Sequence, residues 1–247
     1  MTNIPKNAER RLQENLRKYQ TVVKRAIDND VNERDTVLIV TSMLDYLMGF
    51  DKFEEITSEM AIRKTYCDLA IRIDHKVKLI IEVKSVGSEL RDTFVRQAVN
   101  YGANAGVDWV VLTNGHEFKL YKVIFSKPID HRLIHEFNLL DLSVRKKDDL
   151  EKLYYLTRES IMRKSLDDLA VQKKTLCKYF IAQAVQSNEI VNSVRRVLQR
   201  SAPGTRITNE EIHKILINDV LKRDVVESDK AKEASKRLVQ LDQYTKN

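Results

Sequence analysis

Two apolar runs around a short polar break stand out in the first half of the chain. Residues 67–84 read Cys-Asp-Leu-Ala-Ile-Arg-Ile-Asp-His-Lys-Val-Lys-Leu-Ile-Ile-Glu-Val-Lys. β-Branched and aliphatic residues on either side of such a break predict a β-hairpin. With the turn centred on His75, antiparallel pairing sets these residues opposite one another: Ile73 and Val77, Ile71 and Leu79, Leu69 and Ile81, and Asp68 and Glu82.

Asp68 and Glu82 are the chemically informative pair of this hairpin. Side chains alternate between the two faces of a strand, and like charges directly opposite each other are unfavourable. Two facing carboxylates, with Lys84 two residues further on, therefore predict a cation between them. Mg²⁺ is a hard ion that one or two carboxylates hold while it keeps several waters. The alternative is a solvated strand end that carries Glu and Lys two residues apart.

A metal site of this kind fits hydrolysis of a phosphodiester. A divalent metal polarises phosphoryl oxygens and lowers the pKa of a coordinated water. Lys84 could orient that water or neutralise charge that develops on the phosphorane. We therefore expect Asp68 and Glu82 to bind Mg²⁺, with Mn²⁺ as a substitute, and Lys84 to assist the attacking water.

Asp68 followed by Glu82-Val83-Lys84 resembles the Asp…Glu-x-Lys signature of the PD-(D/E)xK nuclease superfamily. Within it, residues 32–123 resemble the N-terminal nuclease domain of type I restriction enzyme R subunits. The resemblance implies an α/β (α+β) fold with a restriction-endonuclease-like core, a mixed central sheet flanked by helices. Cys67 stands where the usual pattern has proline, a tolerable departure because only the carboxylate binds metal.

Glu33 is a third candidate carboxylate. A helix over residues 32–48 is expected, with Asn32 as its cap and Gly49 as its stop. Counting back four residues along its apolar stripe places Glu33 on the inward face of the first turn, where a charged side chain needs a paired charge or a hydrogen-bond partner. The helix dipole could supply that answer. The resemblance instead implies that Glu33 is a metal ligand, since matching domains carry an acidic residue on this helix.

Gln97 and Tyr101 lie four residues apart on an expected helix over residues 89–105, so they stack on one face. In several nucleases of the superfamily a Gln-x-x-x-Tyr element on this helix faces the active site. The resemblance implies that the pair helps catalysis by positioning a carboxylate or a phosphate. The alternative is that Tyr101 is core and Gln97 is satisfied locally. The expected apolar stripe of this helix holds Leu90, Phe94, Gln97, Ala98, Tyr101 and Ala105.

The remaining sheet elements follow from shorter patterns. An amphipathic helix is expected within residues 1–30, and residues 55–64 alternate well enough for a first strand. Asn114-Gly115 between two apolar runs, 108–113 and 117–125, predicts a two-residue hairpin. Residues 132–140 could add an edge strand. The expected buried stripe of the first helix is Leu12, Leu16, Tyr19, Val23 and Ile27.

Helix-forming residues replace strand residues from about position 145. Residues 145–200 hold 13 Lys and Arg against 7 Asp and Glu, a net charge of +6. We expect a nuclease domain over 1–143 including the N-terminal helix, a basic helical region over 144–200, and a linker with C-terminal helices over 201–247. Thr208 with Glu211 forms a capping-box pattern that opens a helix over 209–222.

Composition restricts the classes of protein that remain. A net charge of +7 favours an anionic partner such as nucleic acid, and 43 % hydrophobic residues suffice for a core. Cys67 and Cys177 are the two cysteines, which fits a reducing cytoplasm. The polar N-terminus predicts no signal peptide, and no apolar run is long enough for a membrane span. Without a Gly-x-x-x-x-Gly-Lys-Ser/Thr motif the chain has no P-loop motor.

These features together predict a Mg²⁺-dependent endodeoxyribonuclease of restriction-enzyme type. DNA is the expected partner, beside a restriction-system subunit and a second copy of the chain docked through residues 165–200. One alternative is a non-cleaving nuclease-fold module that binds nucleic acid or docks on a restriction or defence complex. Another is an RNA-directed nuclease, because the same metal site would serve.

Overall fold

The computed structural model describes residues 3–62 and 65–244, with side chains up to residue 238. The chain divides into two compact units, residues 1–170 and 171–247. The first unit holds a six-stranded sheet and continues beyond residue 143, because α4 (Lys147–Tyr154) contacts both β6 (Asp130–Asn138) and α1 (Lys6–Asp28). Its other elements are α2 (Glu33–Tyr46), β1 (Ile56–Ile62), β2 (Thr65–Ile73), β3 (Lys76–Val83), α3 (Asp92–Ala105), β4 (Trp109–Thr113), β5 (Glu117–Ile124), the 3-10 turn η1 (Leu139–Asp141) and α5 (Arg158–Met162).

The strands lie in the order β1-β2-β3-β4-β5-β6, the same order as in the chain. β3 and β4 are parallel and every other neighbouring pair is antiparallel. The parallel pair arises because α3 carries the chain back across one face of the sheet before β4 begins. The mixed sheet flanked by helices that the sequence predicts is confirmed. Residues 63 and 64 of the expected first strand lie outside the described residues.

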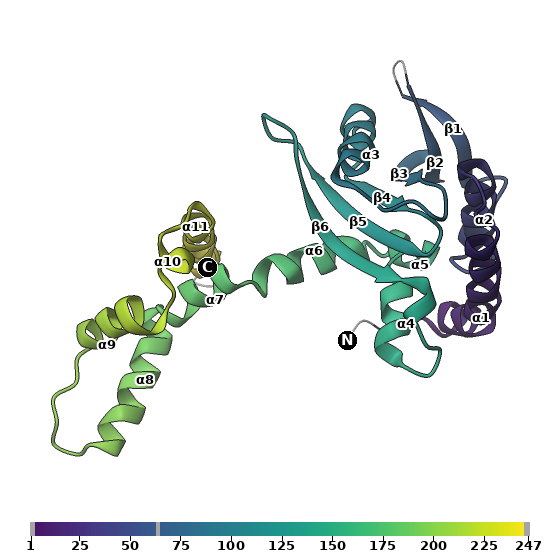
Figure 1. Ribbon diagram of the computed structural model, residues 1–247. Coiled ribbons are helices and arrows are strands. Elements are labelled where there is room, and N and C mark those ends of the chain that lie inside the picture. The colour runs from purple at the N-terminus through teal and green to yellow at the C-terminus, as the bar shows by residue number, and fades with distance from the viewer. Residues whose placement is uncertain (1–2, 63–64, 245–247) are drawn as a thin grey trace. The chain divides into compact units, whose positions relative to one another are not determined.

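Helices cover both faces of the sheet (Figure 1). One apolar cluster packs α1 and α2 against one face, and a second packs α3 against the other. The stripe expected for α1 is buried at Leu12, Leu16, Tyr19 and Val23, whereas Ile27 is 37 % exposed. Burying each large aliphatic or aromatic side chain contributes roughly 1.5–3 kcal/mol. Two such layers hold the central strands rigidly.

The β2–β3 hairpin has a tighter turn than expected. Asp74 (φ 52°) and His75 (φ 61°) both adopt left-handed backbone angles, as a two-residue primed turn requires. The expected pairing of Ile73 with Val77 is therefore wrong, since Ile73 pairs with Lys76. A bulge next to Ile71 absorbs the offset. Beyond the bulge the register is the expected one, with Leu69 opposite Ile81.

The β4–β5 hairpin also differs from the two-residue loop expected at Asn114-Gly115. Thr113 pairs with Phe118, so the loop spans residues 114–117. The Asn114 side chain accepts hydrogen bonds from the backbone N–H groups of His116 and Glu117. Gly115 adopts a φ of +91°. A side chain that satisfies the loop's own backbone stabilises the longer connection.

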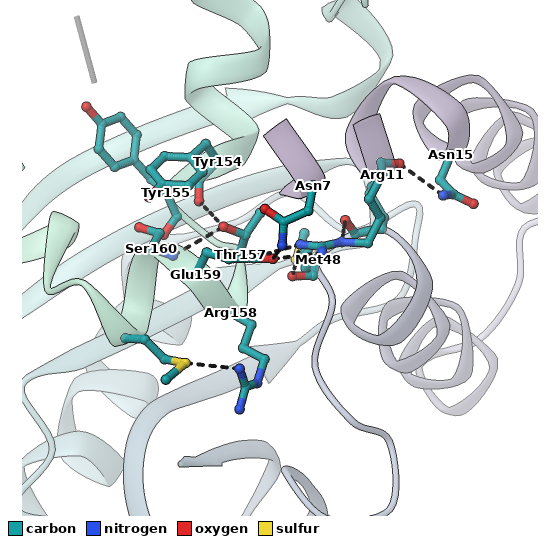
Figure 2. Close-up of polar contacts among 12 residues, drawn as sticks. Asn7, Arg11, Asn15, Met48, Tyr154, Tyr155, Thr157, Arg158, Glu159 and Ser160 are labelled. Carbon is teal, nitrogen blue, oxygen red and sulfur yellow. Dashed lines mark hydrogen bonds and ion pairs between the residues drawn. The ribbon is translucent and has the colours of Figure 1, made fainter. Parts of the chain in front are cut away.

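Arg11 ties three elements of the first unit together (Figure 2). Its guanidinium donates to the carbonyls of Leu47 and Met48, which directly follow α2, and the Met48 carbonyl also accepts the backbone N–H of Arg158. It also forms a bidentate ion pair with Glu159 on α5, at 2.7 and 2.9 Å. Gly49 has a φ of +85°, and a Cβ there would collide with the Arg11 guanidinium. The positive φ favours glycine at this position, shortly after α2 ends.

The second unit is entirely helical among its described residues, which confirms the expected helical C-terminal region. The Thr208–Glu211 capping box forms as predicted, although its α-helix ends at Ile215 and continues as a short π-helix. No helix among residues 3–62 and 65–244 is long and apolar enough to span a membrane. The helices after α6 (Ser165–Thr175), which crosses between the units, are α7 (Lys178–Val185), α8 (Asn188–Ser201), α9 (Asn209–Ile215), the π-helix η2 (Leu216–Val220), α10 (Arg223–Glu227) and α11 (Asp229–Tyr244).

Glu159→Gln should destabilise the first unit in a pH-dependent way. Burial raises the pKa of Glu159, but the hydrogen bonds and charge of Arg11 outweigh burial and hold that pKa below its ordinary value. A carboxylate with a depressed folded pKa adds stability above its unfolded pKa, and this is lost as pH falls through the folded pKa. We expect a loss of about 1–3 kcal/mol at pH 7.

Urea denaturation at pH 7 and again at acidic pH, well below the ordinary glutamate pKa of about 4.3, measures this effect. The difference between Glu159→Gln and wild type should narrow at the lower pH. Glu14→Gln is the matched control, because Glu14 pairs with Arg10 at an exposed site and its loss should change little. A constant difference at both pH values would contradict the assigned role of the Arg11–Glu159 pair.

Candidate functional site

Asp68 within β2 and Glu82 near the end of β3 lie on adjacent antiparallel strands, each one residue beyond the Leu69–Ile81 pair. The Asp68 Oδ2 atom accepts the backbone N–H of Val83 at 2.7 Å, which fixes this side chain against β3. Burial raises the pKa of Asp68, although the Val83 N–H and the charge of Lys84 oppose the rise. The structure thus brings the two carboxylates together as the hairpin predicts.

Glu82 is the most deeply buried acid of this group, with 2 % of the residue exposed. Its Oε1 atom pairs with the Lys84 ammonium at 2.8 Å, whereas Oε2 is buried without a hydrogen-bond partner. Burial is the largest cause that raises the pKa of Glu82; Lys84 lowers this pKa and the charge of Asp68 raises it, with a net result of about 7. A buried carboxylate oxygen without a partner destabilises the fold unless a cation binds to it or the carboxylate is protonated.

Lys84 connects the acids of the site. Its side chain is 10 % exposed, and its backbone N–H donates to the Thr113 carbonyl, which extends the parallel ladder past the end of β3. Its Nζ atom lies 3.6 Å from Glu33 Oε2 and 5.2 Å from the centre of the Phe94 ring. Burial lowers the pKa of Lys84, but the bond to Glu82 and the other acids outweigh it and raise the pKa. The side chain therefore stays an ammonium.

Glu33 reaches the site from the first turn of α2. Asn32 caps that helix by accepting the Asp35 N–H, as expected, and this sets the direction in which the first turn points. The Glu33 side chain is half exposed and contacts the ammonium of Lys84. The structure therefore brings Glu33 to Lys84, and the role of Glu33 as a metal ligand stays a prediction.

Gln97 and Tyr101 bond to each other on α3, where Gln97 Nε2 donates to the Tyr101 hydroxyl at 3.1 Å. Among the residues with described side chains, no hydrogen bond links either one to Asp68 or Glu82. The expected stripe of α3 is rotated, because Ala105 is exposed. The fully buried face consists of Val95, Ala98, Val99 and Gly102. The pair therefore lies at the margin of the buried face, and its catalytic role stays a prediction.

Two further residues belong to the site. Glu59 lies in β1 between Ser58 and Met60, which pair with Leu69 and Cys67 of β2, and its backbone φ is 49°. The negative charge of Glu59 raises the pKa of Asp68. Phe94 places its ring over Lys84. Alternation within the first strand does not reveal Glu59, because its backbone departs from the extended conformation. Phe94 sits three residues before Gln97, so the helical spacing carried a signal for it.

These residues fit a hard divalent cation held by two carboxylates. Within the described part of the chain, no group of three or more His, Cys, Asp or Glu side chains is arranged to hold a metal ion. Two carboxylates are nevertheless enough for Mg²⁺, which retains several waters. The buried Oε2 of Glu82 has no hydrogen-bond partner and lies beside Asp68, so a cation there would answer its charge.

Residues 48–137 match the protein family described as Type I restriction enzyme R protein N terminus. The match confirms, for this segment, the resemblance predicted from the Asp…Glu-x-Lys pattern, and it marks a domain related to restriction enzymes. It includes Asp68, Glu82 and Lys84 but begins after Glu33. No curated protein sequence matches the chain.

A structure described as the type IIG restriction endonuclease BpuSI is similar at 17 % identity and a TM-score of 0.37. The alignment covers 82 % of this chain and 28 % of that one. The chain therefore spans less than a third of the length of that enzyme.

A double substitution tests whether the Glu82–Lys84 ion pair contributes to the free energy of unfolding. Lys84→Met alone leaves the buried Glu82 unpaired and should lower the free energy of unfolding by about 1–3 kcal/mol. Glu82→Leu combined with Lys84→Met should restore that free energy to within about 1 kcal/mol of wild type or raise it, because apolar residues often replace buried ion pairs without loss. Chemical denaturation in EDTA measures both.

A double variant that is less stable than Lys84→Met would contradict this expectation. It would mean that the ion pair stabilises the fold beyond what apolar packing supplies. Recovery of stability would mean that the buried charges are retained for another purpose.

Proposed function

We propose that the chain is a Mg²⁺-dependent endodeoxyribonuclease of restriction-enzyme type, with Mn²⁺ as a substitute cofactor. The observation that carries this proposal is the buried, unpartnered Oε2 of Glu82, beside Asp68 and with the Lys84 ammonium on its other oxygen. A paired acidic site with a cationic neighbour is what hydrolysis of a phosphodiester needs. The match of residues 48–137 to a restriction-enzyme domain supports the same reading.

In this proposal Asp68 and Glu82 hold the cation, and Glu33 is an additional acid at its edge. A bound divalent cation would supply Lewis-acid polarisation of the phosphoryl group and a more acidic water. The Lys84 ammonium donates hydrogen bonds to the attacking water or to oxygens on which negative charge develops. Gln97 and Tyr101 would orient a carboxylate or a phosphate from the margin of α3.

The partners follow from charge and from the restriction-system context. DNA is the proposed substrate, and a subunit of a restriction system is a proposed partner, because the matched family describes only part of a larger R protein. Leu176 and Ile181 are 67 % and 50 % exposed, which supports the proposed homodimer through residues 165–200. No P-loop motif occurs in these 247 residues, so the proposal includes no ATP-driven translocation by them.

A non-cleaving module that binds nucleic acid is the second candidate. The ammonium of Lys84 already occupies oxygens of both Glu82 and Glu33, which is how a site closed by its own lysine would look. Such a module would bind DNA equally in EDTA and in Mg²⁺. Cleavage assays therefore separate the two candidates.

Substitution of Lys84 or Asp68 by Ala should slow plasmid cleavage by about 10²–10³-fold or more, because each removes charge stabilisation of the transition state. Nicking of supercoiled plasmid in Mg²⁺ and in Mn²⁺ measures the rate, and a single-stranded RNA substrate run in parallel tests the RNA-directed alternative. Lys78→Ala is the matched control, since Lys78 is an exposed lysine of the same strand.

Undiminished cleavage by folded Lys84→Ala would contradict the assignment. If wild type nicks no substrate with either metal yet binds DNA in EDTA, the non-cleaving module is favoured.

Arg196 and Arg200 on α8 should contribute to DNA affinity through phosphates. Both are exposed and line a shallow hollow of the helix surface, and within the described residues neither pairs with an acid. Arg196→Gln with Arg200→Gln should reduce the slope of log affinity against log salt by about 2.

Fluorescence anisotropy with duplex DNA at several salt concentrations measures that slope. Arg223→Gln is the control, because Arg223 already pairs with Glu227 four residues on. An unchanged slope in the α8 double variant would place the DNA contacts elsewhere.

A further inference from the structure

The Lys84 ammonium is held from three directions by groups from three elements. Glu82 Oε1 of β3 accepts from it at 2.8 Å, Glu33 Oε2 of α2 lies at 3.6 Å, and the Phe94 ring of α3 lies at 5.2 Å. The carboxylates supply charge, and the ring supplies the negative face of its π system. Lysine has a long flexible stem, so its position depends on what surrounds the ammonium.

We propose that Phe94 is a positioning residue that fixes the ammonium of Lys84 by a cation–π contact. This role rests on the proposed function only for its effect on cleavage; the contact itself is independent of it. Phe94 acts through Lys84, because the polar group that its ring contacts is the Lys84 ammonium.

The environment favours this contact over simple packing. The Lys84 side chain is 10 % exposed, so water competes little for the ammonium, and cation–π attraction strengthens as water is removed. Phe94 is only partly buried and lies outside the fully buried face of α3. Its ring packs at the edge of the core on this side of the sheet and also contacts the ammonium of Lys84.

The ring also limits where the ammonium can move. With its third side closed by Phe94, the ammonium cannot swing toward α3 and away from Glu82. If the ring is lost, the stem gains freedom on that side, and the fraction of molecules with the ammonium between Glu82 and Glu33 falls. That fraction is what an attacking water or a developing charge at the site requires.

Matched substitutions separate the ring face from its volume. Phe94→Leu keeps an apolar side chain without a π face, and we expect it to lower the cleavage rate at saturating DNA by about ten-fold, or about 1.4 kcal/mol. Phe94→Tyr and Phe94→Trp keep the face and should stay within about two-fold of wild type. Phe53→Leu makes the same chemical change at a ring that is 90 % exposed, and should have no effect.

A second readout does not need cleavage. In protein with ¹³C-labelled lysine, ring currents should shift the Lys84 ε-methylene protons upfield, and the signal is assigned by its loss in Lys84→Arg. Lys122, whose Nζ lies 5.0 Å from the Trp109 ring centre, provides a positive reference within the same unit. Phe94→Leu should abolish the Lys84 shift and lower the order parameter of its ε-carbon, while Phe94→Tyr should preserve both.

The two readouts distinguish failure of this proposal from failure of the proposed function. No upfield shift at Lys84, or an unchanged ε-carbon order parameter in Phe94→Leu, would overturn the positioning role whether or not the protein cleaves DNA. Cleavage that is equally fast in Phe94→Leu and wild type would also overturn it. Shift and order that behave as expected in a protein that does not cleave would support the contact and reject the nuclease.

Discussion

The Glu82 carboxylate lies 2 % exposed at the end of β3, and one of its oxygens has no partner. A buried negative charge is unfavourable unless a positive charge or a cation lies close to it, and the neighbouring elements bring such groups to Glu82. β2 brings Asp68, the residue after β3 brings Lys84, and α2 brings Glu33. The parallel β3–β4 pair keeps the end of β3 inside the sheet, since the Lys84 N–H continues the ladder to Thr113. The geometry of the site is therefore a consequence of sheet topology.

Two apolar layers supply the stability that offsets the cost of burying these charges. Helices α1 and α2 cover one face, and α3 covers the other, so the strands that carry the site are fixed from both sides (Figure 1). Arg11 adds a polar tie by binding the end of α2 and Glu159 together (Figure 2). Because α2 also carries Glu33 at its other end, the same helix links the stability of the unit to the position of an acid at the site.

Much of the fold and of the site could be predicted from residue pattern. Alternation and a polar break located the hairpin, and its register placed Asp68 next to Glu82. Side chains alternate between the two faces of a strand, so few pairing registers keep all the apolar residues on one face. The turn at Asp74-His75 escaped prediction, since the bulge that compensates for it has no composition signal. Glu59 and the contact of Lys84 with Phe94 also escaped prediction, because long-range contacts depend on how the helices and strands pack. The rotated face of α3 followed from that packing as well.

The central claim is that Asp68 and Glu82 form a site for a divalent cation. Isothermal titration calorimetry of Mn²⁺ into the metal-free protein, with Glu82→Gln alongside, tests it most directly. Glutamine keeps the shape of Glu82 and removes its charge, so a site built on that charge should fail while the fold persists. We expect saturable binding to wild type and none, or at least ten-fold weaker binding, to Glu82→Gln. Equal binding to both proteins, or no binding to wild type, would contradict the claim.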